Sequence, residues 1–425
     1  MNARERVRKA LNHEETDRAP IDLGSTLVSG IHVSALKRLR EKLGLEEKLP
    51  VAADPLLLVA EVEEDVRSAL HVDCIGLYTK GNAIGLKNTR HKEWTLPDGT
   101  TILVCGDFVF TKEPDGSFAA YPEADVSVPP SARMTSSSLY FDCIVRQEDL
   151  DAKREWDARK DYEGQYPILS DEDLKDLADQ ADFYFNNTEY AIVGTYGNAG
   201  FGDAFHIPGP WMKETKGVRD MADWFMSLHL RPEYIRELFS MQLEIALKNL
   251  ELYRQAVGDK VDVMFVTGTD FAHQHGLLIS RDMYRELFMP FLKEVAGWVH
   301  RHTQWKVFMH TCGAIADLLP DFIETGVDIV NPVQVSASGM DARKLKEAFG
   351  GSIVFWGGGC DPQHTMPKGT PEEVYRETLE NAKVFSRGGG FIGGNVHNIQ
   401  YDVPPENVIA EFQALYEASL QKNKI

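Results

Sequence analysis

The segment from Lys306 to Asp402 repeats one local pattern four times, and this repeat is the strongest constraint on the fold. Four short apolar runs each end in polar or glycine residues, at 306–309, 327–330, 353–356 and 391–392. They are separated by helix-like segments, at 314–324, 341–349 and 370–385. An apolar strand, a polar tip and a helix, repeated, are typical of a parallel sheet that is buried on both faces. The sequence therefore predicts an α/β fold, a (β/α)₈ TIM barrel.

Histidine and cysteine residues follow three of these four runs. His310 and Cys312 follow the first run, Cys360 follows the third and His397 follows the last. In a (β/α) barrel the carboxyl ends of all strands meet at one face, and that face holds the site. Residues i and i+2 of an extended segment share a face, so His310 and Cys312 can reach one ion. Imidazole and thiolate are ligands that zinc prefers, so we expect these residues to supply a Zn²⁺ site.

A simpler interpretation of the same residues stays open at this point. A buried cysteine is usually an inert structural residue, and a histidine can be a hydrogen-bonded core residue without a ligand. Cys74, Cys105 and Cys143 lie in the N-terminal part without any ligand spacing, and we expect them to be structural thiols.

Asp270 follows another apolar run, 261–266, and is the predicted catalytic residue. A carboxylate at a strand tip can act as a base, orient a ligand histidine or hold a cationic substrate group. The alternative is an N-cap on the next helix. Other strand-tip residues are candidates for substrate binding; they are Tyr196, Phe205, His273, Gln274, Asn331, Gln334 and Trp356.

The N-terminal part of the chain mixes helical and β patterns. Helical patterns cover 2–11, 31–43, 55–70, 170–185 and 217–257. We interpret 1–425 as a single barrel domain that carries a β-rich excursion at 87–166. Within the excursion, Asp98-Gly99 lies between alternating residues and predicts a β-hairpin, and Asp115-Gly116 suggests another. The excursion either forms a lid or wall over the site or is a solvated surface segment that takes no part in the site.

Composition excludes some classes of partner. The net charge of −20 argues against nucleic acid and against an anionic membrane surface. No apolar run has the length of a membrane span. The five cysteines form an odd set without the spacing of a disulfide framework, and the first ten residues are charged rather than apolar. We therefore expect a cytoplasmic protein.

Several of these motifs together resemble a known family. The opening Asn2–Val7 with Asp17-Arg18-Ala19-Pro20, the segment 270–276, His310-x-Cys312-Gly313, and His397 followed by 402–408 occur in this order. Over nearly the whole chain this order resembles the uroporphyrinogen decarboxylase superfamily, and within it the cobalamin-dependent methyltransferases.

Two departures from the family pattern narrow the expectation. The decarboxylases carry an arginine-rich motif for porphyrinogen carboxylates, whereas 21–27 contains no arginine here; a substrate with many carboxylates needs such arginines, so we do not expect porphyrinogen decarboxylation. The zinc methyltransferases use His-x-Cys and a later cysteine. At that later position this chain has His397, and Cys360 lies one strand earlier, so either residue or both can complete the metal site.

The resemblance implies a zinc-dependent methyltransferase that works with cobalamin, and a homodimer. This chain lacks the Asp-x-His-x-x-Gly signature of a cobalamin-binding domain, so the corrinoid is expected on a separate corrinoid protein. The small-molecule methyl donor or acceptor is expected to be a methoxylated compound, because aromatic residues recur at the strand tips. Two alternatives stay open: a metal-independent decarboxylase of a small acid that uses Asp270, and a non-catalytic tetrapyrrole- or corrinoid-binding protein.

Overall fold

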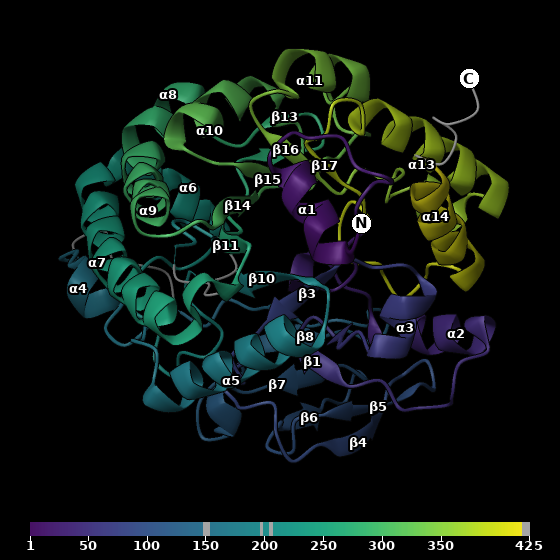
Figure 1. Ribbon diagram of the computed structural model, residues 1–425. Coiled ribbons are helices and arrows are strands. Elements are labelled where there is room, and N and C mark those ends of the chain that lie inside the picture. The colour runs from purple at the N-terminus through teal and green to yellow at the C-terminus, as the bar shows by residue number, and fades with distance from the viewer. Residues whose placement is uncertain (148–153, 196–198, 204–206, 419–425) are drawn as a thin grey trace.

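The centre of the protein is a parallel sheet that curls into a barrel (Figure 1). The computed structural model describes residues 1–147, 154–195, 199–203 and 207–418. Seven strands are hydrogen-bonded side by side in parallel pairs. In spatial order they are β17 (Phe391–Ile392), β16 (Val354–Trp356), β15 (Ile329–Asn331), β14 (Lys306–His310), β11 (Val263–Thr267), β10 (Ala191–Thr195) and β3 (Cys74–Leu77).

A short segment near the N-terminus closes this sheet into a ring. Ile21 forms a parallel bridge with Gly393, directly after β17. The amide of Asp22 donates to the carbonyl of Gly393 at 2.8 Å, and the amide of Asp73, directly before β3, donates to the carbonyl of Ile21 at 2.7 Å. The segment therefore occupies the eighth strand position between β17 and β3, and the predicted (β/α)₈ barrel is confirmed.

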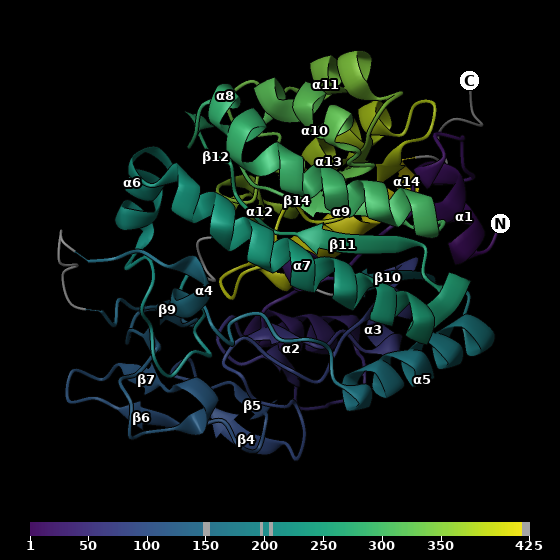
Figure 2. The same ribbon diagram turned by 90° about the vertical axis from the view of Figure 1, so that its left-hand side faces the viewer.

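The barrel interior is apolar, and its amino end is covered by α1 (Ala3–Leu11). Val7, Ala10 and Leu11 on one face of α1 join a buried cluster with inward side chains of the strands, such as Val193 and Phe308. Asn2 and Glu5 form a capping box that fixes the start of this helix. In Figure 2, α1 lies at one end of the barrel, and α6 (Met221–Leu230) lies at the opposite end.

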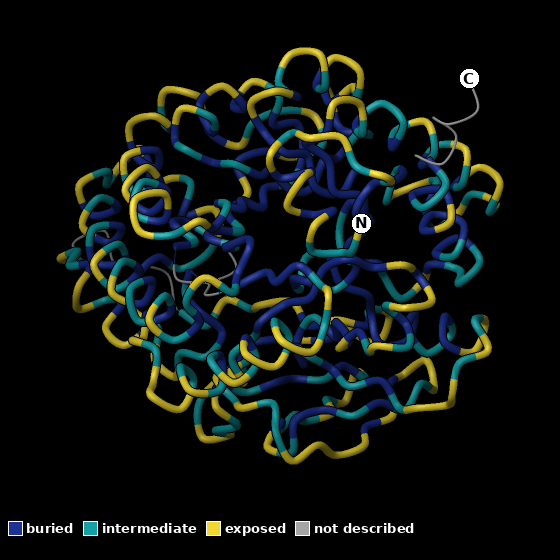
Figure 3. Tube along the Cα trace, viewed as in Figure 1, coloured by how far each residue is buried: buried dark blue, intermediate teal, exposed yellow. Residues whose placement is uncertain are grey.

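Helices surround the sheet and bury their inner faces, and the exposed residues in Figure 3 lie mainly along the outside. Besides α1 and α6 they are α2 (Val33–Leu43), α3 (Glu64–Ala69), α4 (Ala158–Asp161), α5 (Asp171–Asn187), α7 (Pro232–Val257), α8 (Arg281–Met283), α9 (Met289–His302), α10 (Leu319–Thr325), α11 (Ala342–Phe349), α12 (Thr365–Lys368), α13 (Pro371–Phe385) and α14 (Pro405–Glu417). None of the described helices is both long and apolar enough to cross a membrane.

The helix expected over 55–70 is wrong in its first half. Asp54 accepts hydrogen bonds from the amides of Leu56 and Leu57, which holds a turn, and Leu58 has a positive φ of 52°. β2 (Val59–Ala60) then pairs with β1 (Ala52–Asp54), and only α3 is helical. The tract over 217–257 is likewise two helices, because Arg231 precedes Pro232 and leaves the helical conformation, with a φ of −138°.

The β-rich segment holds both expected hairpins. β4 (Lys92–Thr95) pairs with β5 (Thr101–Val104) across Asp98-Gly99, and β6 (Phe110–Lys112) pairs with β7 (Phe118–Ala120) across Asp115-Gly116. Both glycines have positive φ, which the turns require. The second hairpin continues into β8 (Ala132–Met134) and β9 (Asp142–Cys143). These strands lie against the side of the barrel, where the amide of Leu103 bonds the carbonyl of Pro50 (Figure 1).

Candidate functional site

Three of the predicted metal ligands lie together at the carboxyl ends of the strands. His310 is the last residue of β14, Cys312 follows two residues later, and His397 lies in the segment after β17. One ligand atom from each residue lies within 4.8 Å of those of the other two. The Cys312 sulfur is 3.3 Å from Nε2 of His310, and the rings of His310 and His397 have their centroids 5.2 Å apart. We call this group the His-Cys-His cluster.

Asn331 fixes which nitrogen of His310 faces the cluster. Nδ1 of His310 lies 2.6 Å from Oδ1 of Asn331, at the tip of the neighbouring strand β15. The amide nitrogen of Asn331 donates to the carbonyl of Trp356 at 3.1 Å, so its oxygen must face the imidazole and accept from Nδ1–H. Nε2 therefore carries the lone pair that points toward Cys312. A metal-bound histidine usually donates its other ring N–H to an oxygen in this way.

Burial keeps both histidines of the cluster neutral. It lowers the pKa of His310 to about 3, with a further contribution from His397. It also lowers the pKa of His397, whose Nδ1 is hydrogen-bonded to the side-chain oxygen of Asn398. Neutral imidazole is the form that binds a metal.

Asp270 contacts Cys312 rather than either histidine. Its Oδ1 accepts a hydrogen bond from the backbone amide of Cys312 at 2.6 Å. The carboxylate is reached by solvent but is surrounded by protein, which raises its pKa to about 6. Burial and the neighbouring Asp270 raise the pKa of the Cys312 thiol well above its usual value. The N-cap alternative fails, because the next helix, α8, is capped by Ser280.

The donor set fits a zinc ion. Two neutral imidazoles and one thiol are a ligand combination that zinc prefers, and a site with three protein ligands leaves one position open, as in catalytic zinc centres. A cation between these atoms would offset the carboxylate of Asp270 and favour the thiolate form of Cys312. The cluster could therefore hold Zn²⁺ by Nε2 of His310, the Cys312 sulfur and a ring nitrogen of His397.

Cys360 does not join the cluster. Its sulfur lies 3.8 Å from the sulfur of Met366 and 3.9 Å from Oε1 of Glu411, and the side chain is buried. Gly357 and Gly358, which follow β16, have φ of 98° and 76° and turn the chain toward α14. Of the two candidates for the third ligand, the structure therefore places His397 beside His310 and Cys312.

The other predicted site residues lie in different surroundings. Gln334 lines the pocket described below, accepts from the amide of Gly313 at 2.9 Å and donates to Gln274 at 2.6 Å. His273 is exposed on β12 (Ala272–His273), which pairs with β13 (Gly276–Leu277). Trp356 is buried inside the barrel, where its indole nitrogen donates to Asp22 at 2.9 Å. Tyr196 and Phe205 lie outside the described residues.

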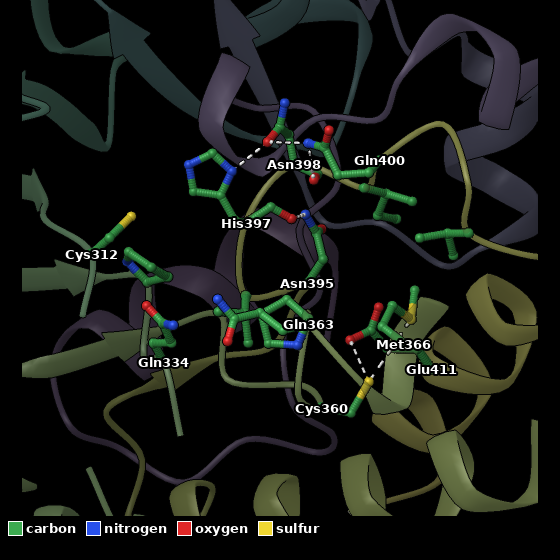
Figure 4. A pocket seen from close by; sticks show the side chains of 15 residues that line it. Cys312, Gln334, Cys360, Gln363, Met366, Asn395, His397, Asn398, Gln400 and Glu411 are labelled. Carbon is green, nitrogen blue, oxygen red and sulfur yellow. Dashed lines mark hydrogen bonds between the residues drawn. The ribbon is translucent and has the colours of Figure 1, made fainter. Parts of the chain in front are cut away.

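A pocket of about 300 Å³ opens beside the His-Cys-His cluster (Figure 4). Cys312 and His397 lie on one side of it, and Cys360, Met366 and Glu411 lie on the other. Neutral polar and aliphatic side chains form the rest of the wall; they are Pro332, Gln334, Pro362, Gln363, Asn395, Val396, Asn398, Ile399, Gln400 and Val403. None of the described residues of 87–166 is among the lining residues.

Asn395 and Glu411 are among the lining residues that sequence reasoning did not single out. Asn395 lies on the same strand tip as His397, and that shared position is a signal that could have found it. Glu411 lies in the middle of α14 between buried residues. In the sequence, its signal is a single carboxylate within the apolar face of a helix.

Comparison with known proteins finds a family that resembles the part of the chain carrying the site. Residues 209–418, which include the whole His-Cys-His cluster and Asp270, match the family described as Uroporphyrinogen decarboxylase (URO-D). This part of the chain therefore resembles that family.

Two proteins that are named methyltransferases resemble this chain. The chain is 28% identical over 145 residues to a methylated-thiol–coenzyme M methyltransferase of Methanosarcina mazei. That match spans 34% of this chain and 36% of the relative. The solved structure of a methyltransferase from Methanosarcina mazei superposes with a TM-score of 0.54 at 16% identity, over 98% of this chain and 99% of that chain, and shares the fold.

Proposed function

We propose that this protein is a zinc-dependent methyltransferase that moves a methyl group between a small compound and the corrinoid of a separate corrinoid protein. The observation that carries the proposal is the His-Cys-His cluster at the carboxyl ends of the barrel strands, beside a pocket. The family match and the methyltransferase names of two relatives support it.

The residues of the site would have distinct roles. His310, Cys312 and His397 would hold the zinc, and Asn331 orients His310. A bound zinc ion supplies Lewis acidity, either to a substrate oxygen or to a substrate thiol. Asp270 holds the backbone of Cys312 and places a negative charge beside the thiol, so we propose that it positions this ligand and balances the charge of the metal.

The pocket lining favours a neutral or cationic substrate over an acid. The described lining residues include no lysine and no arginine, and Glu411 is an acid. In the segment where the decarboxylases carry arginines, this chain has Asp22, whose carboxylate accepts hydrogen bonds from the hydroxyl of Ser25 and the indole nitrogen of Trp356. A carboxylate substrate would find no bidentate partner among these residues. The decarboxylase alternative is therefore not favoured, and neither is an anionic tetrapyrrole ligand.

Our proposal for the methyl donor is based on the size and lining of the pocket, and not on the aromatic residues near the strand tips. Phe201 packs against Phe239, and Phe271 packs against Tyr284 and Phe288, so these aromatic side chains belong to the core. A small methoxylated compound remains our proposed donor, because a methyl ether is neutral and compact enough for a pocket of about 300 Å³. The homodimer also stays a proposal, which light scattering tests.

Zinc content and turnover of one variant test the function. The purified protein should contain about one zinc per chain, and it should transfer methyl from members of a panel of methoxylated and methylthiolated compounds to free cob(I)alamin. Cys312→Ala should lose both the zinc and the transfer but keep a melting temperature close to that of the parent, because the barrel core does not depend on the metal. Cys143→Ala, which removes an exposed thiol, is the matched control. A parent protein that binds no zinc, or a Cys312→Ala protein that unfolds with the loss of its metal, contradicts the proposal.

A further inference from the structure

The pocket has a second polar end, opposite the His-Cys-His cluster, that the proposed methyl transfer does not use. Glu411 on α14 lines this end together with Cys360 and Met366, and Figure 4 shows its carboxylate directed toward the middle of the pocket. Only 1% of the Glu411 residue is exposed. A carboxyl group buried this deeply loses its hydration, which is costly unless a partner replaces it.

One of the two oxygens of the Glu411 carboxyl group lacks that partner among the residues that the structure describes. Oε1 lies beside the sulfur of Cys360, whereas Oε2 has no hydrogen-bond partner among the described residues. Gly359 makes room for the group, since a Cβ at that position would collide with Oε1 and would lie 3.1 Å from the carbonyl of Gly394. The carboxyl group therefore lies next to the strand tip that carries Asn395.

Asn395 supplies a second acceptor without a partner in the same pocket. Its side-chain nitrogen faces the carbonyls of His397 and Gly30, which fixes the orientation of the amide. Its Oδ1 is buried and has no partner among the described residues. Two buried acceptors without partners among the described residues line one pocket, and they suit a ligand that donates hydrogen bonds.

The charges around this end favour a cation. Glu377, whose carboxylate accepts from the amide of Asp361, adds a negative charge near Glu411, and no lysine or arginine is found among the described lining residues. Burial and Glu377 raise the pKa of Glu411 to about 8, which reflects the cost of an uncompensated carboxylate there. An ammonium group would offset this cost, and it carries three N–H donors for the unpartnered acceptors of this pocket, whereas a hydroxyl has one donor.

We propose that Glu411 and Asn395 bind a primary ammonium group at one end of the substrate, while the methyl-bearing end lies at the His-Cys-His cluster. The substrate class is therefore a small methylated or methoxylated amine. This inference rests on the proposed function for the identity of the methyl-bearing end. The ammonium site itself is defined by the two free acceptors.

Calorimetric binding to the purified protein at pH 7 tests the site with four probes of one shape. The probes are 4-methoxybenzylamine, 4-methoxybenzyl alcohol, 4-methylanisole and 4-methoxybenzoate, whose far ends are an ammonium, a hydroxyl, a methyl and a carboxylate. The amine should bind about ten- to a hundredfold more tightly than 4-methylanisole, with the alcohol between them and the benzoate weakest. Equal affinities for the amine and 4-methylanisole overturn the proposal, and this comparison needs no variant.

A pair of isosteric substitutions then assigns the effect to Glu411. Glu411→Gln should lower the affinity for the amine about ten- to a hundredfold and leave that for 4-methylanisole unchanged. Glu406→Gln, the same substitution in the first turn of α14 at a residue paired with Lys42, should change neither. A Glu411→Gln protein that keeps the full preference for the amine contradicts the assignment.

The two proposals fail separately. Selective amine binding without methyl transfer from any compound to cob(I)alamin overturns the methyltransferase proposal and leaves the ammonium site in place. Methyl transfer with no preference for an amine overturns the ammonium site and leaves the methyltransferase proposal in place.

Discussion

Removing the side chain of Asn331 should weaken zinc binding without touching a ligand. Asn331 is fully buried and makes two hydrogen bonds: its oxygen accepts from His310 and its nitrogen donates to the carbonyl of Trp356. In Asn331→Ala, His310 loses the oxygen that fixes its tautomer and ring orientation. Loss of such a partner typically lowers metal affinity about 10- to 100-fold, which corresponds to roughly 1.4–2.7 kcal/mol.

The same change should also cost stability, and a matched variant separates the two effects. Asn331→Ala leaves two buried groups without partners, at about 1–3 kcal/mol each, so unfolding should become easier by about 2–6 kcal/mol. Asn249 on α7 is equally buried and also makes two hydrogen bonds, to the amide of Leu169 and the carbonyl of Pro167, both at 2.9 Å. Asn249→Ala should lose comparable stability and keep the zinc affinity of the parent.

The assay is competition for zinc against a coloured chelator, with urea unfolding of the zinc-free proteins alongside. Asn331→Ala should release zinc at a lower chelator concentration than either the parent or Asn249→Ala. Equal zinc affinity in all three proteins would refute the role assigned to Asn331. Equal loss in both variants would show that stability, and not the orientation of His310, sets the affinity.

Three further predictions follow from other contacts. Asp270→Asn should lower the turnover of methyl transfer and leave the melting temperature nearly unchanged, because the carboxylate contacts Cys312 and caps no helix. Full activity in steady-state assays would contradict this. Asp73→Ala should lower the free energy of unfolding by about 3–5 kcal/mol in urea titrations, because Arg6 and Arg18 both donate to this buried carboxylate, and a loss below about 1 kcal/mol would show that the arginines find water instead. The pKa of Glu411 is raised from an ordinary value near 4.5 to about 8. Between these two pH values the folded state therefore holds a proton that the unfolded state has released. The free energy of unfolding should fall as the pH rises through this range. Glu411→Gln should remove this part of the pH dependence, and parallel stability curves for parent and variant between pH 5 and about 8 would refute it.

The sequence alone determined the fold class, because the signals for it are local. Each apolar run, with its polar tip and the helix that follows, lies within a stretch no longer than one βαβ unit, about 30 residues. The turns at Asp98-Gly99 and Asp115-Gly116 are equally local, since glycine supplies the positive φ that the turns need. His310 and Cys312 are likewise neighbours on one strand end, so their proximity could be expected from spacing alone.

Local signals misled where a tertiary contact competed with them. Residues 55–58 have a helical pattern, yet the Asp54 carboxylate holds a turn and Val59 pairs with β1. Aromatic residues at strand tips suggested a substrate pocket, but Phe271 and Trp356 are packed into the core. A pattern of residue types shows that a side chain is apolar, and only the arrangement of the barrel shows which surface it contacts.

Only the tertiary structure decided between Cys360 and His397 as neighbours of His310. Both follow strands that are close to β14 in space but distant in sequence, so their spacing carries no information about direction. The turn at Gly357-Gly358 directs Cys360 toward Met366 and Glu411, while the segment after β17 brings His397 to the cluster. The ammonium site was also invisible in the sequence, because it depends on two oxygens, from a strand tip and from the middle of α14, that lack partners only once the chain has folded around them.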